Sequence, residues 1–150
     1  MGCTSRLANG QTSIEDFGCA LATADSEMLE QSREDGFASQ QTDSDARDFA
    51  SCLGHPNPFL RDKIGYDVLT ATLRAGSVSA ATRRDLIVDL SGNLSTKDDD
   101  GFLAPFSALG LSELDRTDRV EPFLTPDERV NIANITATYL ASVSDYRAFS

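Results

Sequence analysis

The residues best suited to chemistry in this chain of 150 are three aspartates followed by a glycine, Asp98-Asp99-Asp100-Gly101. Carboxylates this close repel one another unless they lie in water, at a helix N-terminus or around a cation. An EF-hand loop with its glycine here would begin at Thr96 and end at Ser107, so two essential ligands are missing. The pattern favours a solvated loop whose last aspartate caps the next helix. A weak Mg²⁺ or Ca²⁺ site formed by Asp98 and Asp100, and with it a metal-dependent hydrolase, is the alternative.

A second group of reactive residues surrounds His55, the one histidine of the chain. Cys52 stands three residues before it, and a cysteine beside a histidine can form a thiolate nucleophile. However, Cys52 lies next to Leu53 on an apolar helix face, and no serine lies in a nucleophile-elbow pattern. We therefore interpret His55 as part of a turn and Cys52 as a buried structural thiol. No catalytic residue and no cofactor are expected.

The three cysteines, Cys3, Cys19 and Cys52, are far apart and show no paired spacing. Neither a disulfide framework nor a zinc ribbon is indicated, and the reducing cytoplasm is the expected location. No apolar run approaches the roughly 18 to 20 residues of a membrane span, so no membrane contact is expected.

The chain is acidic, with a net charge of -11 and a pI of about 4.3. Proteins that bind nucleic acids or anionic membranes rely on clustered Lys and Arg, so neither class of partner is expected. Residues 1–55 hold three arginines against ten carboxylates. We expect residues 1–42 to be an acidic polar leader, partly disordered or weakly helical, and residues 43–150 to be the folded domain. An acidic inhibitor that imitates nucleic acid is a further alternative.

Apolar periodicity predicts helices through most of the domain. Asn57 as N-cap and Pro58 in the first turn begin one helix, which Gly76 ends. A helix over 79–94 follows a three-residue turn and is expected to form an antiparallel hairpin with it. A third helix covers Phe102 to the segment "DRTDR", and Thr125 and Glu128 form a capping box for a fourth. The expected buried stripes are Leu60, Ile64, Val68 and Ala71; Leu86, Ile87, Leu90 and Leu94; Phe102, Phe106, Leu109 and Leu114; and Val130, Ala133, Ala137 and Leu140.

Upstream, a shorter helix over 44–53, with Ala46, Phe49, Ala50 and Leu53 as its buried stripe, and a weaker one over 13–24 are predicted. No segment shows the alternation of a strand. The fold class is all-α, with antiparallel hairpins stacked as a short HEAT/armadillo-like α-solenoid. The turn containing Pro56 and Pro58, followed by Arg61 and Asp62, is similar to the HEAT repeat. That resemblance implies a structural role for Arg61, whose guanidinium can bond to the turn carbonyls and an aspartate.

A second and more specific resemblance rests on three segments that follow one another in the chain: "CLGHPNPFLRDKIGYDVLTATLRAG", "LSTKDDDGFLAPFSALGLSELDR" and "PFLTPDERVNIANITATYLASVSDYRAF". Over roughly residues 45–150 the chain resembles a bacterial family known as domain of unknown function 2785. The motif positions that carry the resemblance include Asp99, Asp100, Gly101 and Phe106. Membership implies a HEAT-like helical fold in the cytoplasm, with no established activity and no catalytic residue to transfer.

One departure from that family concerns the C-terminus. The family continues with a helix containing a tryptophan and two histidines, whereas this chain has no Trp and only His55. The resemblance therefore implies either a member shortened at its C-terminus or one whose reading frame has been cut. The expected function is a non-catalytic interaction or scaffold module with a protein partner, because solenoid surfaces bind proteins and nothing in the sequence requires catalysis.

Overall fold

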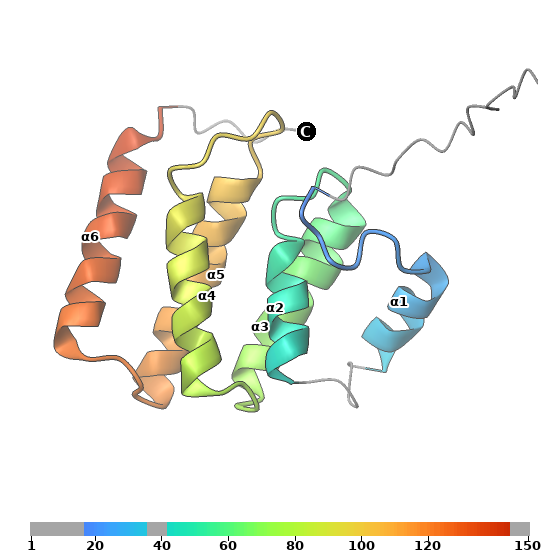
Figure 1. Cartoon of the computed structure of the whole chain (residues 1–150), viewed down its shortest axis with the longest axis horizontal. Helices are drawn as coiled ribbons and strands as arrows, with labels where there is room; N and C mark the ends of the chain where they lie inside the picture. The colour runs from blue at the N-terminus through green and yellow to red at the C-terminus, as the bar shows by residue number, and fades with distance from the viewer. Residues whose placement is uncertain (1–16, 36–41, 145–150) are drawn as a thin grey trace, which may run out of the picture.

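The computed structural model describes residues 17–35 and 42–144, and within them the chain is all-helical, without a strand (Figure 1). The elements are α1 (Ser26–Glu34), α2 (Asp43–Ser51), η1 (Phe59–Val68), α3 (Leu69–Arg74), α4 (Ala80–Asn93), α5 (Leu103–Val120) and α6 (Pro126–Ser142). The all-α prediction is confirmed. None of these helices is both long and apolar enough to cross a membrane.

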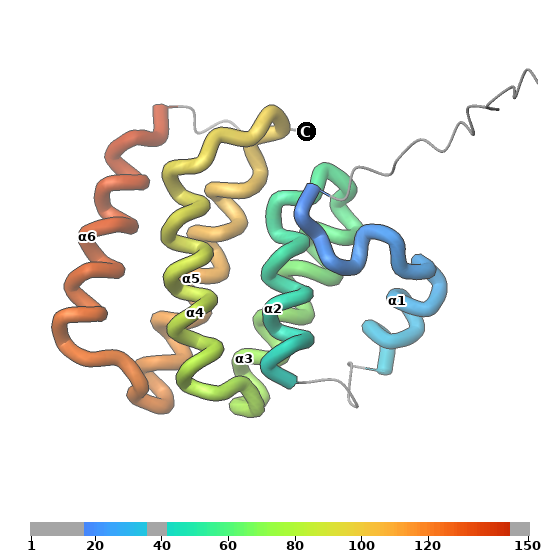
Figure 2. The backbone as a smooth tube through the Cα atoms, viewed as in Figure 1, coloured from blue at the N-terminus to red at the C-terminus, as the bar shows by residue number. Residues whose placement is uncertain are grey.

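The helices lie in two layers. Figure 1 shows α6, α4 and α2 side by side in front, with α5 behind α4 and α3 behind α2. The tube in Figure 2 shows the same order, with α1 beside α2 at the opposite end of the row from α6. We expected residues 57–76 and 79–94 to form a hairpin, but α4 packs mainly against α5, while α2 packs against η1 and α3.

Local capping sets where three of the helices begin. The Thr42 hydroxyl accepts from the Asp45 N–H at the start of α2, and the Ser79 hydroxyl accepts from the Thr82 N–H at the start of α4. At the start of α6, Thr125 and Glu128 form the predicted capping box. Each cap satisfies backbone donors that the first turn of a helix leaves free.

The helix predicted to begin at Asn57 has an unexpected form. Asn57 accepts the Phe59 N–H at 2.9 Å as an N-cap does, and Gly76 ends the helix with φ +76°. The first ten residues, η1, form a π-helix, which is wider than an α-helix because its bonds run from i to i+5. The wider turns rotate the buried face, so Leu69, Thr72 and Leu73 are buried after Val68, while Ala71 is exposed.

The core runs between the two layers. The predicted stripes of α2 and α4 are buried as expected, and Leu60, Ile64 and Val68 of η1 are buried with them. In α5, Phe102 and Phe106 are half-buried, Leu114 is fully buried, and Leu109 is exposed, so the predicted stripe is wrong at Leu109. Besides Leu111 and Leu114, the buried face of α5 consists of small and polar residues: Ser107, Gly110, Glu113, Thr117 and Asp118.

The N-terminal part departs most from expectation. The helix predicted over 13–24 is wrong for residues 17–24, which form turns, and residues 13–16 lie outside the described residues. The helix of this region is α1, which begins one residue after Asp25, whose carboxylate accepts the Glu27 and Met28 N–H groups. The division of the chain at residue 42 stays a prediction.

Candidate functional site

The aspartate cluster serves the start of α5. Asp98 Oδ2 accepts the backbone N–H groups of Phe102 at 3.0 Å and Leu103 at 3.3 Å. The cap is therefore the first aspartate, whereas the sequence suggested the last. Asp99 and Asp100 are exposed in the turn that Gly101 completes with φ +71°. Across residues 17–35 and 42–144, no three His, Cys, Asp or Glu side chains gather in a way that could hold a metal ion.

Arg61 lies at the junction of the proline turn and α5. Its guanidinium donates to Asp62 Oδ1 at 2.7 Å, to the Pro56 carbonyl at 3.3 Å and to the His55 carbonyl at 3.5 Å. The side chain is only 8% exposed because it also lies over two aromatic rings, with Cζ 3.9 Å from the Phe102 centroid and 5.0 Å from that of Phe106. Pro58, the other turn proline, precedes η1 directly.

The aromatic contacts of Arg61 were not part of the sequence-based interpretation. A guanidinium over an aromatic face gains electrostatic attraction in addition to its hydrogen bonds. The two phenylalanines come from the start of α5, some forty residues away, so sequence spacing gave no signal of this contact. Arg61 thus connects the proline turn to the start of α5.

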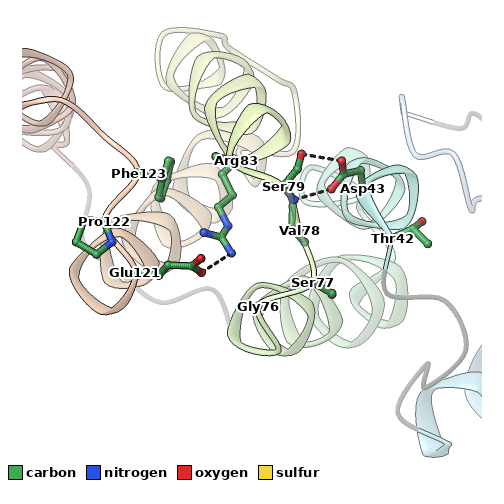
Figure 3. Close-up of a pocket in the computed structure, with 11 residues that line it drawn as sticks. Thr42, Asp43, Gly76, Ser77, Val78, Ser79, Arg83, Glu121, Pro122 and Phe123 are labelled. Carbon is green, nitrogen blue, oxygen red and sulfur yellow. Dashed lines mark hydrogen bonds and ion pairs between the residues drawn. The ribbon is translucent and has the colours of Figure 1, made fainter.

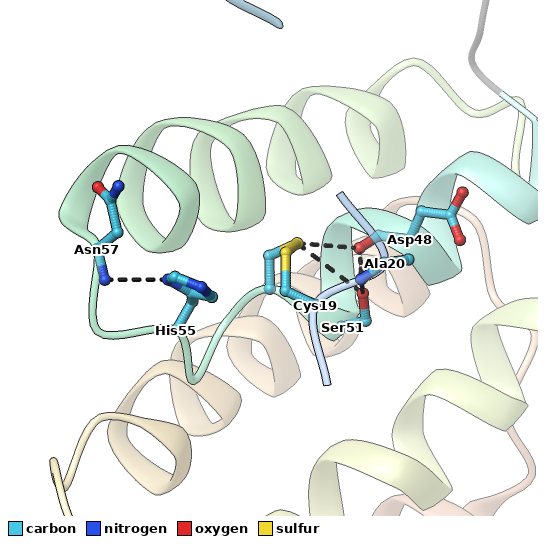
Figure 4. Close-up of a disulfide and its surroundings, with 7 residues drawn as sticks. Cys19, Ala20, Asp48, Ser51, His55 and Asn57 are labelled. Carbon is cyan, nitrogen blue, oxygen red and sulfur yellow. Dashed lines mark hydrogen bonds between the residues drawn. A yellow bond between two sulfur atoms is a disulfide. The ribbon is translucent and has the colours of Figure 1, made fainter. Parts of the chain in front are cut away.

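Cys52 is bonded to Cys19, which corrects the expectation of unpaired thiols (Figure 4). The two residues are 33 positions apart, and their Cα atoms are 4.2 Å apart. His55, nearby, accepts the Asn57 N–H on Nδ1 at 3.0 Å and lies edge-on to the Phe17 ring. A disulfide sulfur is not a nucleophile, so a Cys52–His55 pair is not formed in this state. The expectation of a cytoplasmic location rested in part on cysteines that showed no pairing, and the disulfide removes that support.

A polar hollow of about 770 Å³ lies where three connections meet (Figure 3). Asp43, the first residue of α2, accepts both the backbone N–H and the hydroxyl of Ser79 at 2.7 Å, and these bonds lower the pKa of Asp43. Arg83 is 3% exposed and donates to Glu121 at 3.1 Å, with Phe123 beside it at 5.4 Å from its Cζ. The polar groups of this hollow thus tie α2, α4 and the α5–α6 connection together.

The first turn of α6 is firmly attached to the rest of the fold. Asp118, only 2% exposed, accepts the N–H groups of Phe123 and Leu124 at 2.8 Å each and pairs with Arg129 at 2.5 Å. The hydrogen bond from Arg129, together with those two N–H donors, lowers the pKa of Asp118 to about 2. Arg84 of α4 also donates to Glu128 at 3.0 Å.

The rest of α6 is different, because no residue of this helix is fully buried. The predicted buried stripe is wrong: Val130 is 59% exposed, Leu140 is 57% exposed, and Ala133 and Ala137 are exposed between them. The half-buried residues that pack on the core are Ile132, Ile135 and Tyr139. The helix carries two apolar stripes, and the presence of both in the sequence was the signal that one of them would face outward.

Two grooves flank α6. The one between α5 and α6 has a volume of about 400 Å³ and is lined by Ala108 and Leu111 on one side and Ala133, Ala137 and Leu140 on the other. The second, of about 870 Å³, lies between α6 and the α4–α5 connection; its apolar lining includes Leu94, Ile135 and Tyr139. Burial in this lining raises the pKa of Tyr139. Together with the exposed stripe, the grooves form an apolar surface at the end of the row of helices.

Comparisons with known proteins bear on this same part of the chain. No curated protein and no solved structure matches the sequence. A family model matches residues 90–150, which include the last turn of α4 and all of α5 and α6. Over these residues the predicted resemblance is confirmed, and the family that the chain resembles is described as "Protein of unknown function (DUF2785)".

Proposed function

We propose that this protein is a non-catalytic interaction module, a short HEAT-like α-solenoid whose α6 end binds an amphipathic helix of a partner protein. One observation carries the proposal: the exposed face of α6 is uncharged. Positions 130–144 contain no Asp, Glu, Lys, Arg or His, although most of them are exposed. At the 25% charged content of the whole chain, fifteen positions hold about four charges.

An exposed helix without charge has few explanations in an acidic protein. The centre of a protein–protein interface is depleted of charged residues, whereas a solvated helix face carries them. The other long helix that lines the groove, α5, carries charged residues along its exposed positions, including Asp115, Arg116 and Arg119. The difference between α5 and α6 fits a face of α6 that is covered when the protein works.

The arrangement of the layers supports a helix as the partner element. α2 is backed by η1 and α3, and α4 is backed by α5, but no described helix backs α6 (Figure 1). The groove between α5 and α6 lies at that position. Alanines at 133 and 137 allow a close approach of another backbone, with Leu140 and Leu111 as apolar contacts. Binding of an amphipathic helix in an apolar groove is a known recognition mode.

The charge of the chain narrows the chemistry of the partner. The net charge is -11, and Asp115 lies at the edge of the α5–α6 groove. A partner helix with Leu or Ile on one face and Lys or Arg on its flanks would complement both the groove and the field around it. The absence of nucleic-acid partners and the cytoplasmic location stay predictions. The metal-dependent alternative loses support because Asp98 already caps α5.

The test places a photo-crosslinking amino acid at position 137 and uses the full chain as bait in an extract of the native host. Ala137→Glu puts a charge in the centre of the exposed face, while Met28→Glu, at an exposed position on α1, is the matched control. We expect the wild type and M28E to capture one protein and A137E to lose it. The crosslinker at position 137 should react with a helical segment of that partner protein.

Three outcomes would contradict the proposal. The first is capture that A137E leaves unchanged, and the second is a crosslink to a segment that is not helical. The third is a dimer of the pure protein, seen by light scattering and abolished by A137E, which would make a second copy the occupant of the face.

A further inference from the structure

The N-terminal flap, residues 17–35, is attached to the rest of the protein at few points. Cys19 is bonded to Cys52, and the Ala20 N–H donates to the Ser51 hydroxyl at 2.9 Å (Figure 4). Leu29 is the one residue of α1 that is buried. Further contacts with the body are made by half-buried Leu21 and Ala22, by the edge of the Phe17 ring and by α1 against η1. The covalent bond is therefore its principal attachment.

The polar groups of the flap are mostly satisfied within the flap itself. Arg33 pairs with Glu30, Gln31 donates to Asp35, and Asp25 caps α1. Across the contact, Lys63 and Asp67 of η1 lie near this pair, at exposed positions where ion pairs contribute little. These ion pairs and hydrogen bonds of α1 therefore remain intact when the flap leaves the body.

The start of the flap is held in an unfavourable backbone conformation. Phe17 has φ +46°, in the left-handed region, and Gly18 follows with φ +78°. A non-glycine residue pays a steric penalty in this region because its Cβ approaches the following carbonyl oxygen. Phe17 lies two residues before Cys19, so release of the disulfide allows this strain to relax.

The rest of the protein offers a hydrogen-bond acceptor to the Cys52 thiol when the disulfide is reduced. Its Sγ lies 3.5 Å from the Asp48 carbonyl oxygen, a distance at which a thiol can donate a hydrogen bond. The neighbouring Ser51 hydroxyl already donates to the same carbonyl at 2.6 Å and does not depend on the disulfide. Figure 4 shows the Ser51 hydroxyl directed at this carbonyl. The end of α2 is thus compatible with a reduced cysteine as well as with a bonded one.

From these observations we propose that the Cys19–Cys52 disulfide is a reversible redox latch, which holds the N-terminal flap over the end of α2 and the outer face of η1. Its reagent is a dithiol reductant. Opening of the latch uncovers this face and leaves α4, α5 and α6 folded. The proposal is independent of the function proposed for α6, at the other end of the row.

The chemistry is a thiol–disulfide exchange. Both sulfurs are buried, so the reagent reaches them when the flap opens locally. One thiolate of the dithiol attacks Cys19 Sγ, the Sγ–Sγ bond breaks, and Cys52 leaves as a thiolate that takes up a proton. The second thiol then displaces Cys19. The protein gains two electrons and two protons, and the dithiol leaves as its own disulfide. An oxidised dithiol drives the reverse reaction.

The test measures hydrogen exchange of the full chain after equilibration with reduced or with oxidised dithiothreitol. We expect amides of α1 to exchange at least about tenfold faster in the reduced protein, with α4 and α5 unchanged and with protection restored on reoxidation. Cys19→Ser should show the fast exchange under both conditions. Cys3→Ser, the matched control, should keep the difference. Alkylation and peptide mapping establish which cysteines are bonded in each sample.

The proposal is overturned if Cys19 and Cys52 are both alkylated after treatment with the oxidised dithiol, or if protection of α1 does not depend on reduction. It also fails if α4 and α5 lose protection together with α1. In that case the disulfide would stabilise the whole fold and would not act on the flap alone.

Discussion

The two ends of the row of helices are finished in opposite ways. At the α2 end, the flap covers the row, buries Leu29 and is bonded through Cys19 to Cys52. At the α6 end, the first turn is fixed by Asp118 and Arg84, while the exposed face of the helix is uncharged from position 130 on and no described helix covers it. One end is thus closed by a covalent bond and the other is held rigidly but left open. This contrast fits the proposed function, in which the exposed face of α6 binds a partner.

The largest expected effect is at the attachment of α6. Asp118→Ala removes a buried acceptor from two backbone N–H groups and from Arg129, and breaking a buried pair in this way costs about 3 to 4 kcal/mol. Urea unfolding should show this loss. The matched change Asp115→Ala, at an exposed i,i+4 pair with Arg119, should cost less than about 0.5 kcal/mol. Equal effects would mean that Asp118 does not anchor α6.

The next effect concerns the closed end. In oxidising buffer, Cys19→Ser removes the constraint of a disulfide that spans 33 positions and should lower the free energy of local unfolding of the flap by about 3 kcal/mol, with the unfolding of α4 and α5 unchanged. In excess reductant, C19S and the wild type should have nearly equal stability. A difference that persists in reductant would indicate that the Cys19 side chain stabilises by packing alone.

The attachment of α6 should also make the stability of the protein depend on pH. The folded-state pKa of Asp118 is lowered to about 2 from 3.8, so its contribution is present above about pH 4 and is lost as pH falls toward 2. This lowering corresponds to about 2 kcal/mol at neutral pH. Stability measured from pH 6 to 2 should therefore fall more steeply for the wild type than for Asp118→Asn, and parallel curves would contradict this.

The smallest expected effect on stability is at the open face. Leu140→Glu and Val130→Glu replace exposed side chains and should change the free energy of unfolding by less than about 0.5 kcal/mol. If the proposed function is right, the same variants lose partner capture as A137E does. A large loss of stability in the pure protein would show that the face is already covered without a partner.

What could be predicted from the sequence was local. The caps at Asn57, Ser79 and Thr125 depend on residues within three positions, and each was found where expected. The stripes of α2 and α4 followed from ordinary α-helical periodicity. Ala71 was misplaced because the periodicity assumed 3.6 residues per turn, and η1 has a wider turn.

What could not be predicted depended on contacts between distant segments. Cys19 and Cys52 meet only because the flap folds back over the end of α2, and their spacing matches no motif. The outward stripe of α6 was mistaken for a buried one because periodicity gives the direction of a face and not what covers it. The small and polar inner face of α5 carried no apolar signal, since its burial follows from packing against α4.

The hydrogen bonds between Asp43 and Ser79 have a consequence for how the protein unfolds. Stacked helical units often melt one after another, because each contacts only its neighbours. Here the first residue of α2 also accepts the backbone N–H and hydroxyl of the residue that caps α4. Fraying of α2 therefore weakens the start of α4, and the two helices share these hydrogen bonds at their N-terminal ends. The protein should therefore melt as a single cooperative unit although its helices lie in a row.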